Sequence, residues 1–387
     1  MFQPPLAVTL IVAAFAGLAQ CAALARAHEV PQEYRPRIVG GGTARIAVEA
    51  PRDKRFAHLS WPKVVRRDDG TIVLAYIAGV FHGDHGGGSP AVSVSTDEGK
   101  TFTSPQVLRR FGPEEDYTQS GNLALGIAPD GAFVLLAMAY TGTGKGIVGT
   151  AGVGNHIYGW RSTDGRSWTP TDTSALGPNI TGSVFGNICP TSDGKLAVLG
   201  HYRAPSQPAK GIWLAMSNDD GRTWGKPRQI TDVDAAEPLL LVTEKRWLAF
   251  LRSKGSGRQY VSVSDDAGTT WTTSISALAP PPQHRLAAPF AVVNPASKNE
   301  VLVLTTERVG SQLETPSKIQ LWRGSLDKLA WKQERALIEF PKSADNPNTD
   351  LGYVWLLPSG AGRWQLYFYY GRGHGENSIW VADVTIE

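Results

Sequence analysis

The chain has 387 residues, of which 42 are glycine, 26 are proline and only 19% are charged. This length allows a large core, and the many glycines and prolines indicate a chain rich in turns rather than in long helices. The formal net charge is +3, and no basic run is long enough to suggest binding to nucleic acid. The composition therefore favours a globular protein with a surface of mixed charge.

The first residues differ from the rest of the chain. The stretch at 6–25 carries no charge and ends in small residues, which is typical of a secretory signal peptide. We expect cleavage after Ala25 or Ala27, with residues 1–27 as the signal peptide and the mature protein secreted or in the periplasm. The stretch is also long enough to remain as a membrane anchor, which is the second interpretation.

Cysteine use adds little. Removal of the signal peptide leaves Cys189 alone, so no disulfide can form within the mature chain. Pro190 follows it and no histidine lies nearby in the sequence. We therefore expect Cys189 to be a small buried apolar residue rather than a nucleophile.

Six segments each contain two β-rich apolar runs separated by a tight turn. Asp-Gly forms the turn in the first three, which is a strong signal for a β-hairpin. After each of the first five, a polar stretch and a third apolar run follow. The six segments start at residues 61, 121, 186, 237, 288 and 352.

A second repeat has the pattern Ser-x-Asp-(x)-Gly-x-Thr/Ser-aromatic. In such a turn the Asp carboxylate can accept hydrogen bonds from backbone groups, and Gly supplies a positive φ. A catalytic acid has no reason to recur in several outer turns, so we expect these aspartates to hold the turns together. The repeat lies at 95–102, 162–168, 217–224 and 264–271, with a degenerate copy at 325–331, and its aspartates are Asp97, Asp164, Asp219 and Asp266.

Together the two repeats predict the fold. Each unit has two inner strands, a third strand, the box turn and an outer fourth strand. Six such units describe an all-β chain, a six-bladed β-propeller of four-stranded antiparallel blades that fills residues 28–387. No segment shows helical periodicity over three turns.

The boxes are Asp-box (BNR) repeats, and the mature chain resembles the sialidase (neuraminidase) superfamily. Such boxes also occur in other propellers, and the fourth unit narrows the resemblance. Residues 237–271 are similar to the sialidase segment that holds a catalytic Glu, a substrate-binding Arg on the next strand and then a box. The resemblance assigns these two roles to Glu237 and Arg252.

The resemblance implies an exported exo-glycosidase that releases a terminal sialic acid or a related acidic sugar with retention. In that family a Tyr is the nucleophile, a Glu is its base and a separate Asp is the acid/base. These roles map onto Tyr353, Glu237 and, in the Gly-rich loop after the first hairpin, Asp84. Tyr369 and Tyr370 are alternative nucleophiles, from the neighbouring strand.

The hairpin geometry predicts a basic rim. The start of one inner strand and the end of the next lie at the same mouth, so the ends of the second strands should form a ring. Three arginines in that ring would bind a carboxylate of the substrate. The ring residues are Tyr76, Tyr140, Arg203, Arg252, Arg308 and Tyr370.

Two positions depart from the family pattern. The Phe/Tyr-Arg-Ile-Pro motif that supplies a clamp arginine is missing, and Ser60 stands in place of that arginine. Lys318 stands where a further clamp arginine is expected, and it lacks the planar fork of Arg. Arg203, Arg308 or Arg55 could compensate. The chain is therefore a divergent relative, and an acidic sugar is a firmer expectation than sialic acid itself.

Two other functions remain open. One is a glycosidase or lyase acting on uronate-containing polysaccharide with a histidine acid or base; the other is a non-catalytic glycan-binding propeller. A metal at His82, Asp84 and His85 is a weak signal, and we expect no required metal and no cofactor. The expected partners are acidic glycans, with no nucleic acid, no membrane beyond the signal peptide, and a monomeric protein. The histidines considered for the first alternative are His58, His82, His85, His201 and His374.

Overall fold

The structure is a computed structural model, and the chain divides into Met1–Arg35 and Pro36–Glu387. The predicted signal peptide lies outside the described residues, and the account below concerns the second unit. The structure describes residues 35–42, 44–82, 87–141, 149–203, 208, 210–254, 258–281, 284–309, 315–341, 350–371 and 375–387.

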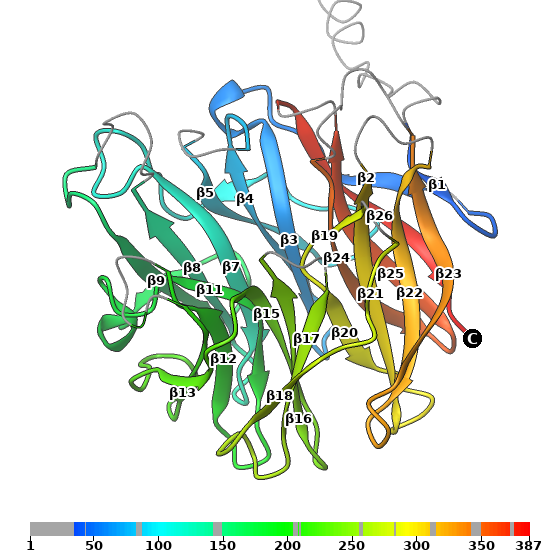
Figure 1. Ribbon diagram of the computed structural model, residues 1–387. Helices are drawn as coiled ribbons and strands as arrows, with labels where there is room; N and C mark the ends of the chain where they lie inside the picture. The colour runs from blue at the N-terminus through cyan, green and yellow to red at the C-terminus, as the bar shows by residue number, and fades with distance from the viewer. Residues whose placement is uncertain are drawn as a thin grey trace, which may run out of the picture. The chain divides into compact units, whose positions relative to one another are not determined.

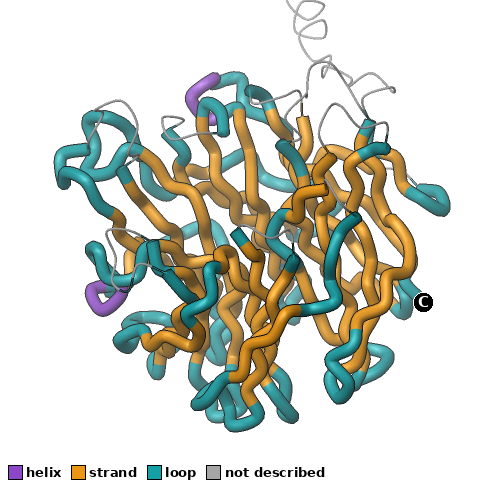
Figure 2. The backbone as a smooth tube through the Cα atoms, viewed as in Figure 1, coloured by secondary structure: helices purple, strands orange, loops and turns teal. Residues whose placement is uncertain are grey.

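The described chain consists of strands joined by loops (Figure 2). Its helices are two short 3₁₀ turns, η2 (Lys54–Phe56) and η3 (Ser174–Leu176), and no α-helix occurs in the described ranges. The prediction of an all-β chain is confirmed. Within the same ranges, no helix has the length and apolar character needed to cross a membrane.

The strands fall into six antiparallel groups that follow one another along the chain (Figure 1). Each predicted hairpin forms the first two strands of a group. Group 1 is β3 (His58–Arg66), β4 (Ile72–Gly79), β5 (Ser89–Ser95) and β6 (Gln106–Val107), and group 2 is β7 (Gln119–Ile127), β8 (Phe133–Tyr140), β9 (Asn155–Ser162) and β10 (Thr169–Thr171). Group 3 is β11 (Ser183–Pro190), β12 (Leu196–His201), β13 (Ile212–Ser217) and β14 (Arg228–Thr231), and group 4 is β15 (Ala235–Val242), β16 (Trp247–Ser253), β17 (Gln259–Ser264) and β18 (Thr272–Ile275).

The last two groups recruit strands from the start of the chain, which the sequence analysis did not predict. β1 pairs with β23 and β2 pairs with β26, both antiparallel. Group 5 is β19 (His284–Leu286), β20 (Phe290–Val293), β21 (Glu300–Val309), β22 (Ser317–Ser325), β23 (Trp331–Phe340) and β1 (Arg37–Ile38); group 6 is β24 (Gly352–Gly360), β25 (Arg363–Gly371), β26 (Asn377–Thr385) and β2 (Ala44–Val48).

The first strands of successive groups adjoin one another. β3 contacts β7, β7 pairs in parallel with β11, β11 contacts β15, β15 contacts β20 and β20 contacts β24. β24 in turn contacts β3, and Asn377 pairs with His58, so that red β26 lies beside blue β3 in Figure 1. Among the described residues these pairings give four open sheets.

Apolar side chains fill the space between neighbouring groups. One cluster joins Val73 and Val92 of group 1 to Leu123 and Phe133 of group 2. Because a strand covered on both faces has no polar side, all eight residues of β4 are buried. Cys189 belongs to a similar cluster between groups 3 and 4, and burial raises the pKa of its thiol to about 12.

The first strand of every group is interrupted at the same level. In β3 the pairing with β4 jumps from Ser60 to Lys63, and equivalent shifts occur in β7, β11, β15 and β24. In group 5 the first strand is split into β19 and β20, which both pair with β21. A bulge bends its strand and re-aims the extra side chain, and this irregularity positions the site described below.

The box turns contain the hydrogen bonds that a structural role requires. Asp219 accepts from the Ser217 hydroxyl at 2.8 Å, from the Thr223 backbone N–H at 2.9 Å and from the Thr223 hydroxyl at 2.7 Å. Asp220 and Gly221 have positive φ, at 58° and 80°. Partial burial raises the pKa of Asp219, but the hydrogen bonds from Thr223 outweigh it and leave that pKa lowered. Asp97, Asp164 and Asp266 make the equivalent contacts.

Replacing Asp219 with alanine should lower the free energy of unfolding by about 1–3 kcal/mol, because the Thr223 N–H and two hydroxyls lose their acceptor. Urea unfolding followed by tryptophan fluorescence measures this. Asn218→Ala, an exposed change in the same turn, is the matched control and should stay within about 0.5 kcal/mol of the wild type. Equal effects of the two changes would contradict the turn role.

Candidate active site

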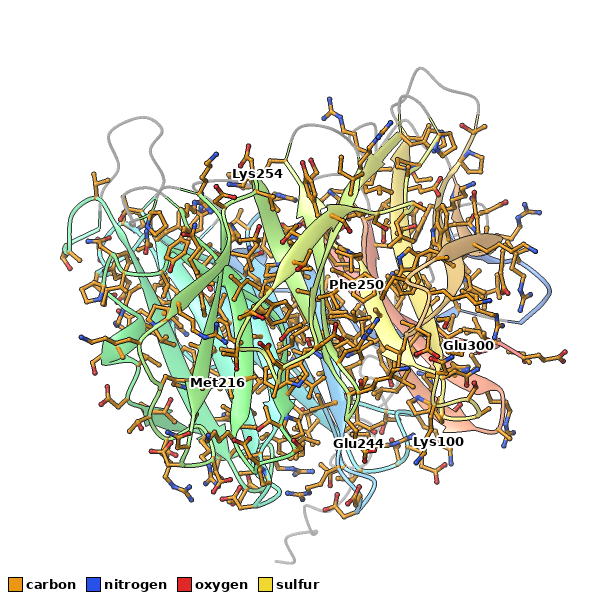
Figure 3. The ribbon with its side chains drawn as sticks, turned by 60° about the horizontal axis from the view of Figure 1, so that its bottom comes forward. Lys100, Met216, Glu244, Phe250, Lys254 and Glu300 are labelled. Carbon is orange, nitrogen blue, oxygen red and sulfur yellow. The ribbon has the colours of Figure 1, made fainter. Side chains whose placement is uncertain are left out.

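One cavity of about 460 Å³ collects side chains from all six groups. This size is within the range of small-molecule pockets. Figure 3 shows Lys254 and Glu244 at opposite ends of the β15–β16 hairpin with Phe250 between them, and Arg252 lies near the Lys254 end. The cavity is lined by His58, Ser60, Trp61, His82, Gln119, Asn122, Tyr140, Arg203, Glu237, Arg252, Arg308 and Tyr353, among others.

Glu237 is hydrogen-bonded to both Tyr353 and Arg252. The Tyr353 hydroxyl donates to Oε1 of Glu237 at 2.7 Å, and Nη1 of Arg252 donates to Oε2 at 2.6 Å. Arg252 also donates to the Tyr353 oxygen at 3.2 Å. A phenol, a carboxylate and a guanidinium from β24, β15 and β16 therefore meet on the cavity floor, although Glu237 and Tyr353 are 116 positions apart.

Burial and neighbouring charges fix the protonation states in the trio formed by Glu237, Tyr353 and Arg252. Burial opposes ionisation of Glu237, but the charge and hydrogen bond of Arg252 and the hydrogen bond of Tyr353 leave its pKa lowered. Burial, and then the charge of Glu237, raise the pKa of Tyr353 well above its usual value. The resting state is a carboxylate beside a protonated phenol, which is the arrangement of a base poised to activate a nucleophile.

His201 fixes the backbone next to Glu237. The Glu237 N–H donates to Nδ1 of His201 at 3.3 Å. Burial lowers the pKa of His201 to about 3, so the ring is neutral and its Nδ1 can accept that hydrogen bond.

Three cavity residues occupy left-handed backbone conformations at the strand bulges. Trp61, Glu237 and Tyr353 have φ of 54°, 50° and 51°. Each such conformation costs on the order of 1–3 kcal/mol in a residue other than glycine. The cost persists because the paired strands on either side impose it. The bulges turn these side chains toward the cavity.

Arg308 links this trio to a second cluster. It donates through Nη2 to the Leu351 carbonyl at 2.7 Å and to the Tyr369 hydroxyl at 3.0 Å. The Tyr369 hydroxyl donates in turn to Oδ1 of Asp350 at 2.6 Å. Arg308 also lies 5.2 Å from the centre of the Tyr353 ring, so its cation borders both clusters.

Asp350 has two histidine neighbours. Nδ1 of His82 lies 2.7 Å from its Oδ1, and Nε2 of His58 lies 3.2 Å from its Oδ2. The three ligand atoms lie within 4.8 Å of one another, and these side chains are the ones in the described ranges that could hold a metal ion.

Lys63 lies near the trio, and its side chain is buried, with 1% exposed. Its Nζ is 4.1 Å from the centre of the Phe185 ring and 5.2 Å from that of Trp355, so aromatic faces surround the ammonium. Burial lowers the pKa of Lys63 to about 7, although the charge of Glu237 opposes this.

The remaining predicted site residues are distributed as follows. Arg203 lines the cavity and stacks over Tyr140 at 4.3 Å. Lys318 lies 3.5 Å from Glu307 and does not line the cavity. Tyr369 and Tyr370 do not line it either; successive strand residues point to opposite faces, and Tyr369 points toward Asp350. Asp84, His85 and His374 lie outside the described residues.

Tyr76 corrects one detail of the predicted rim. β4 continues to Gly79, so Tyr76 is interior, fully buried and hydrogen-bonded to Ser93 at 2.8 Å.

No role for Trp61 was predicted from the sequence. The signal was present in the parallel between Trp61-Pro62 and Glu237-Pro238, which mark the same bulge in two groups.

Lys63→Met should be more stable than the wild type at pH 7, and the difference should shrink as the pH rises. The folded-state pKa of about 7 lies below the ordinary 10.5, so between these values the unfolded chain holds a proton that the folded chain has lost. Wild-type stability should therefore rise with pH in this window by up to about 1.4 kcal/mol per unit. Urea unfolding of both proteins at several pH values measures this, and parallel curves would contradict it.

The comparisons with known proteins come from sequence and from structure. A family model described as a BNR repeat-like domain matches residues 113–337. No curated protein matches the sequence. A protein of unknown function from Dyadobacter fermentans has a TM-score of 0.63 and 21% identity, covering 90% of this chain and 100% of that one.

Solved sialidases share the same fold. The leech intramolecular trans-sialidase has a TM-score of 0.65 at 13% identity and covers 90% of this chain and 70% of that one. The NanB sialidase of Streptococcus pneumoniae has a TM-score of 0.63 at 13% identity and covers 88% of this chain and 70% of that one. Since the family model covers more than half of the sequence, the chain belongs to the BNR repeat-like domain family.

Proposed function

We propose that the protein is an exo-glycosidase of the sialidase type that removes a terminal acidic sugar with retention of configuration. The observation that carries this proposal is the 2.7 Å hydrogen bond from the Tyr353 phenol to the buried Glu237 carboxylate on the floor of a sugar-sized cavity. Arg252 keeps the carboxylate ionised and touches both partners.

The reaction proceeds in two steps. Glu237 takes the Tyr353 proton as the phenol oxygen bonds to the anomeric carbon and the bond to the leaving oxygen breaks. A protonated acid, assigned here to Asp84 on the resemblance to sialidases, gives its proton to the leaving oxygen. Water then transfers a proton to Asp84, its oxygen bonds to the anomeric carbon, and the released Tyr353 regains its proton from Glu237.

The charge of the cavity favours an anionic sugar. Arg203, Arg252 and Arg308 line it, and a carboxylate on the substrate would find their guanidinium groups nearby. Ser60 occupies the position of the missing family arginine, and its buried hydroxyl has no hydrogen-bond partner among the described residues. We therefore propose an acidic-sugar substrate, with sialic acid as the first member to test.

We further propose that the six groups are the blades of one β-propeller. The cyclic order of contacts between first strands, from β3 through β24 and back to β3, supports this proposal. The N-terminal strand β2 pairs with β26 and completes the last blade. This pairing joins the start of the chain to its end and would close the ring of blades. Export through the segment at residues 1–27 is proposed from the sequence alone, and cell fractionation would test it.

Tyr353→Phe and Glu237→Gln should each lower kcat for a fluorogenic α-sialoside by at least about 100-fold, because one removes the nucleophile and the other its base. Tyr367→Phe removes a buried hydroxyl from the neighbouring strand β25 and serves as the control with full turnover. Turnover retained by both site variants would refute the mechanism. A product that absorbs in the ultraviolet would identify a lyase instead.

Asp84→Ala should slow release of an alkyl leaving group by roughly 100-fold and release of an activated aryl leaving group far less, because only the poor leaving group needs the proton. Rates on the two substrates give the comparison. Asp68→Ala, an exposed change in the β3–β4 turn, is the control with both rates unchanged. Equal losses on both substrates would argue against Asp84 as the acid.

A further inference from the structure

The carboxylate of Asp350 is 2% exposed and lies beside His58 and His82, which line the cavity. It accepts a hydrogen bond from the Tyr369 hydroxyl at 2.6 Å and a long one from the Asn377 amide at 3.4 Å. A buried carboxylate needs compensation from its neighbours, and His82 also forms a hydrogen bond with it at 2.7 Å. The groups that face it from β3 and from the end of β4 are the histidines His58 and His82.

The tautomer of His58 follows from its other contact. Nδ1 of His58 lies 2.9 Å from the Gly375 carbonyl oxygen, which can only accept, and 3.3 Å from the Asn377 amide nitrogen; the shorter contact favours the tautomer with a proton on this nitrogen. In the neutral ring Nε2 then presents a lone pair. That lone pair is 3.2 Å from Oδ2 of Asp350, and Nε2 is buried without a hydrogen-bond partner among the described residues. Two electron-rich atoms face each other, so a cation or a proton belongs between them.

His82 completes the arrangement from the cavity side. Its Nδ1 lies 2.7 Å from Oδ1 of Asp350, and the side chain is 36% exposed. The Trp61 ring packs edge-on against it at 4.9 Å and limits where the imidazole can point. His58 and His82 both line the cavity, so a group bound between them would be open to a ligand there.

We propose that His58, His82 and Asp350 bind a divalent transition-metal ion, with Zn²⁺ the best fit, and leave one coordination position open to the cavity. Two imidazoles and one carboxylate are the ligand set of catalytic zinc sites, in which a fourth position takes water or substrate. Oxygen-only ions such as Ca²⁺ and Mg²⁺ fit this set poorly.

Metal binding requires the three side chains to rearrange. Bonds of about 2.1 Å in a tetrahedron place ligand atoms roughly 3.4 Å apart. The two nitrogen–oxygen distances, to different oxygens of Asp350, are 2.7 and 3.2 Å, and all three ligand atoms lie within 4.8 Å of one another. The partly exposed His82 must therefore move away from the Asp350 oxygen for an ion to enter between them.

The hydrogen bonds around these side chains are of the kind found around metal ligands in proteins. A ligating histidine donates its other N–H to a carbonyl or carboxylate, as His58 does to Gly375. A ligating carboxylate is itself hydrogen-bonded, as Asp350 is to Tyr369 and Asn377. These contacts orient the ligand atoms before an ion arrives.

The site also bears on substrate binding, and this step rests on the proposed function. His58 is two positions before Ser60, which stands in place of the family's clamp arginine. A zinc ion held by His58 would supply a positive charge beside that position. Its open coordination site would take a carboxylate or hydroxyl oxygen of the sugar, and Arg308 reaches the same cluster through Tyr369.

The first experiment measures zinc binding to the full-length protein after dialysis against a chelator. Zn²⁺ should raise the melting temperature of the wild type, and Co²⁺ should give the visible absorption of a tetrahedral site. His82→Ala should weaken binding by more than tenfold, and because His82 is partly exposed this variant should fold. His58→Gln is the second variant.

The matched control is His284→Gln. His284 forms a buried pair with Glu307 at 3.1 Å in group 5 and does not line the cavity. Zinc binding by this variant should equal that of the wild type. Absence of binding to the wild type, or equal binding by the wild type and His82→Ala, would overturn the site and would mean that a proton lies between His58 and Asp350.

The second experiment tests whether zinc bound at this site contributes to sugar binding. Calorimetry with N-acetylneuraminic acid should give more than tenfold tighter binding to the zinc-loaded than to the metal-depleted protein. Zinc binding with unchanged sugar affinity would overturn the role and leave the site. Failure of Tyr353→Phe to lower turnover would overturn the proposed mechanism without affecting the zinc measurements.

Discussion

The site depends on one backbone irregularity that recurs in every group. A regular first strand would alternate its side chains between two packed faces, and the extra residue of a bulge breaks that alternation. Trp61, Glu237 and Tyr353 adopt left-handed conformations there and so reach the cavity. The paired strands around each bulge hold these strained residues in place. The same constraint therefore explains why Trp61, Glu237 and Tyr353 come from first strands and lie at one level.

Buried charge is the second organising feature, and it is compensated locally. Glu237 pairs with Arg252, and Arg308 is bonded to Leu351 and Tyr369. Removing one partner of such a pair leaves an uncompensated charge, which ties stability to the intact site. Lys63 differs, because aromatic rings rather than a carboxylate surround its ammonium and burial depresses its pKa. Its Nζ lies 5.9 Å from the centre of the Tyr353 ring.

The cavity contains both residues that fit the family pattern and residues that depart from it. The BNR repeat-like match establishes the family, while the likeness to solved structures, at identities of 21% or less, shows the fold alone. The trio of Glu237, Tyr353 and Arg252 is compatible with sialidase chemistry. The cluster of Asp350 with His58 and His82 lies close in sequence to Ser60, and the proposed zinc ion would add positive charge near that altered position.

The sequence by itself determined the all-β class, the six hairpins and the box turns, because turn residues and alternating apolar runs act over short distances. Glu237, Arg252 and Tyr353 were found through resemblance, and the structure brings them together. The sequence did not reveal the bulges, the pairing of Asp350 with His58 and His82, the orientation of Tyr369 toward Asp350, or the strands β1 and β2 that join groups 5 and 6. These depend on strand register and on contacts between residues hundreds of positions apart. Only the tertiary structure decides them, since a shift of one residue reverses every side chain on a strand.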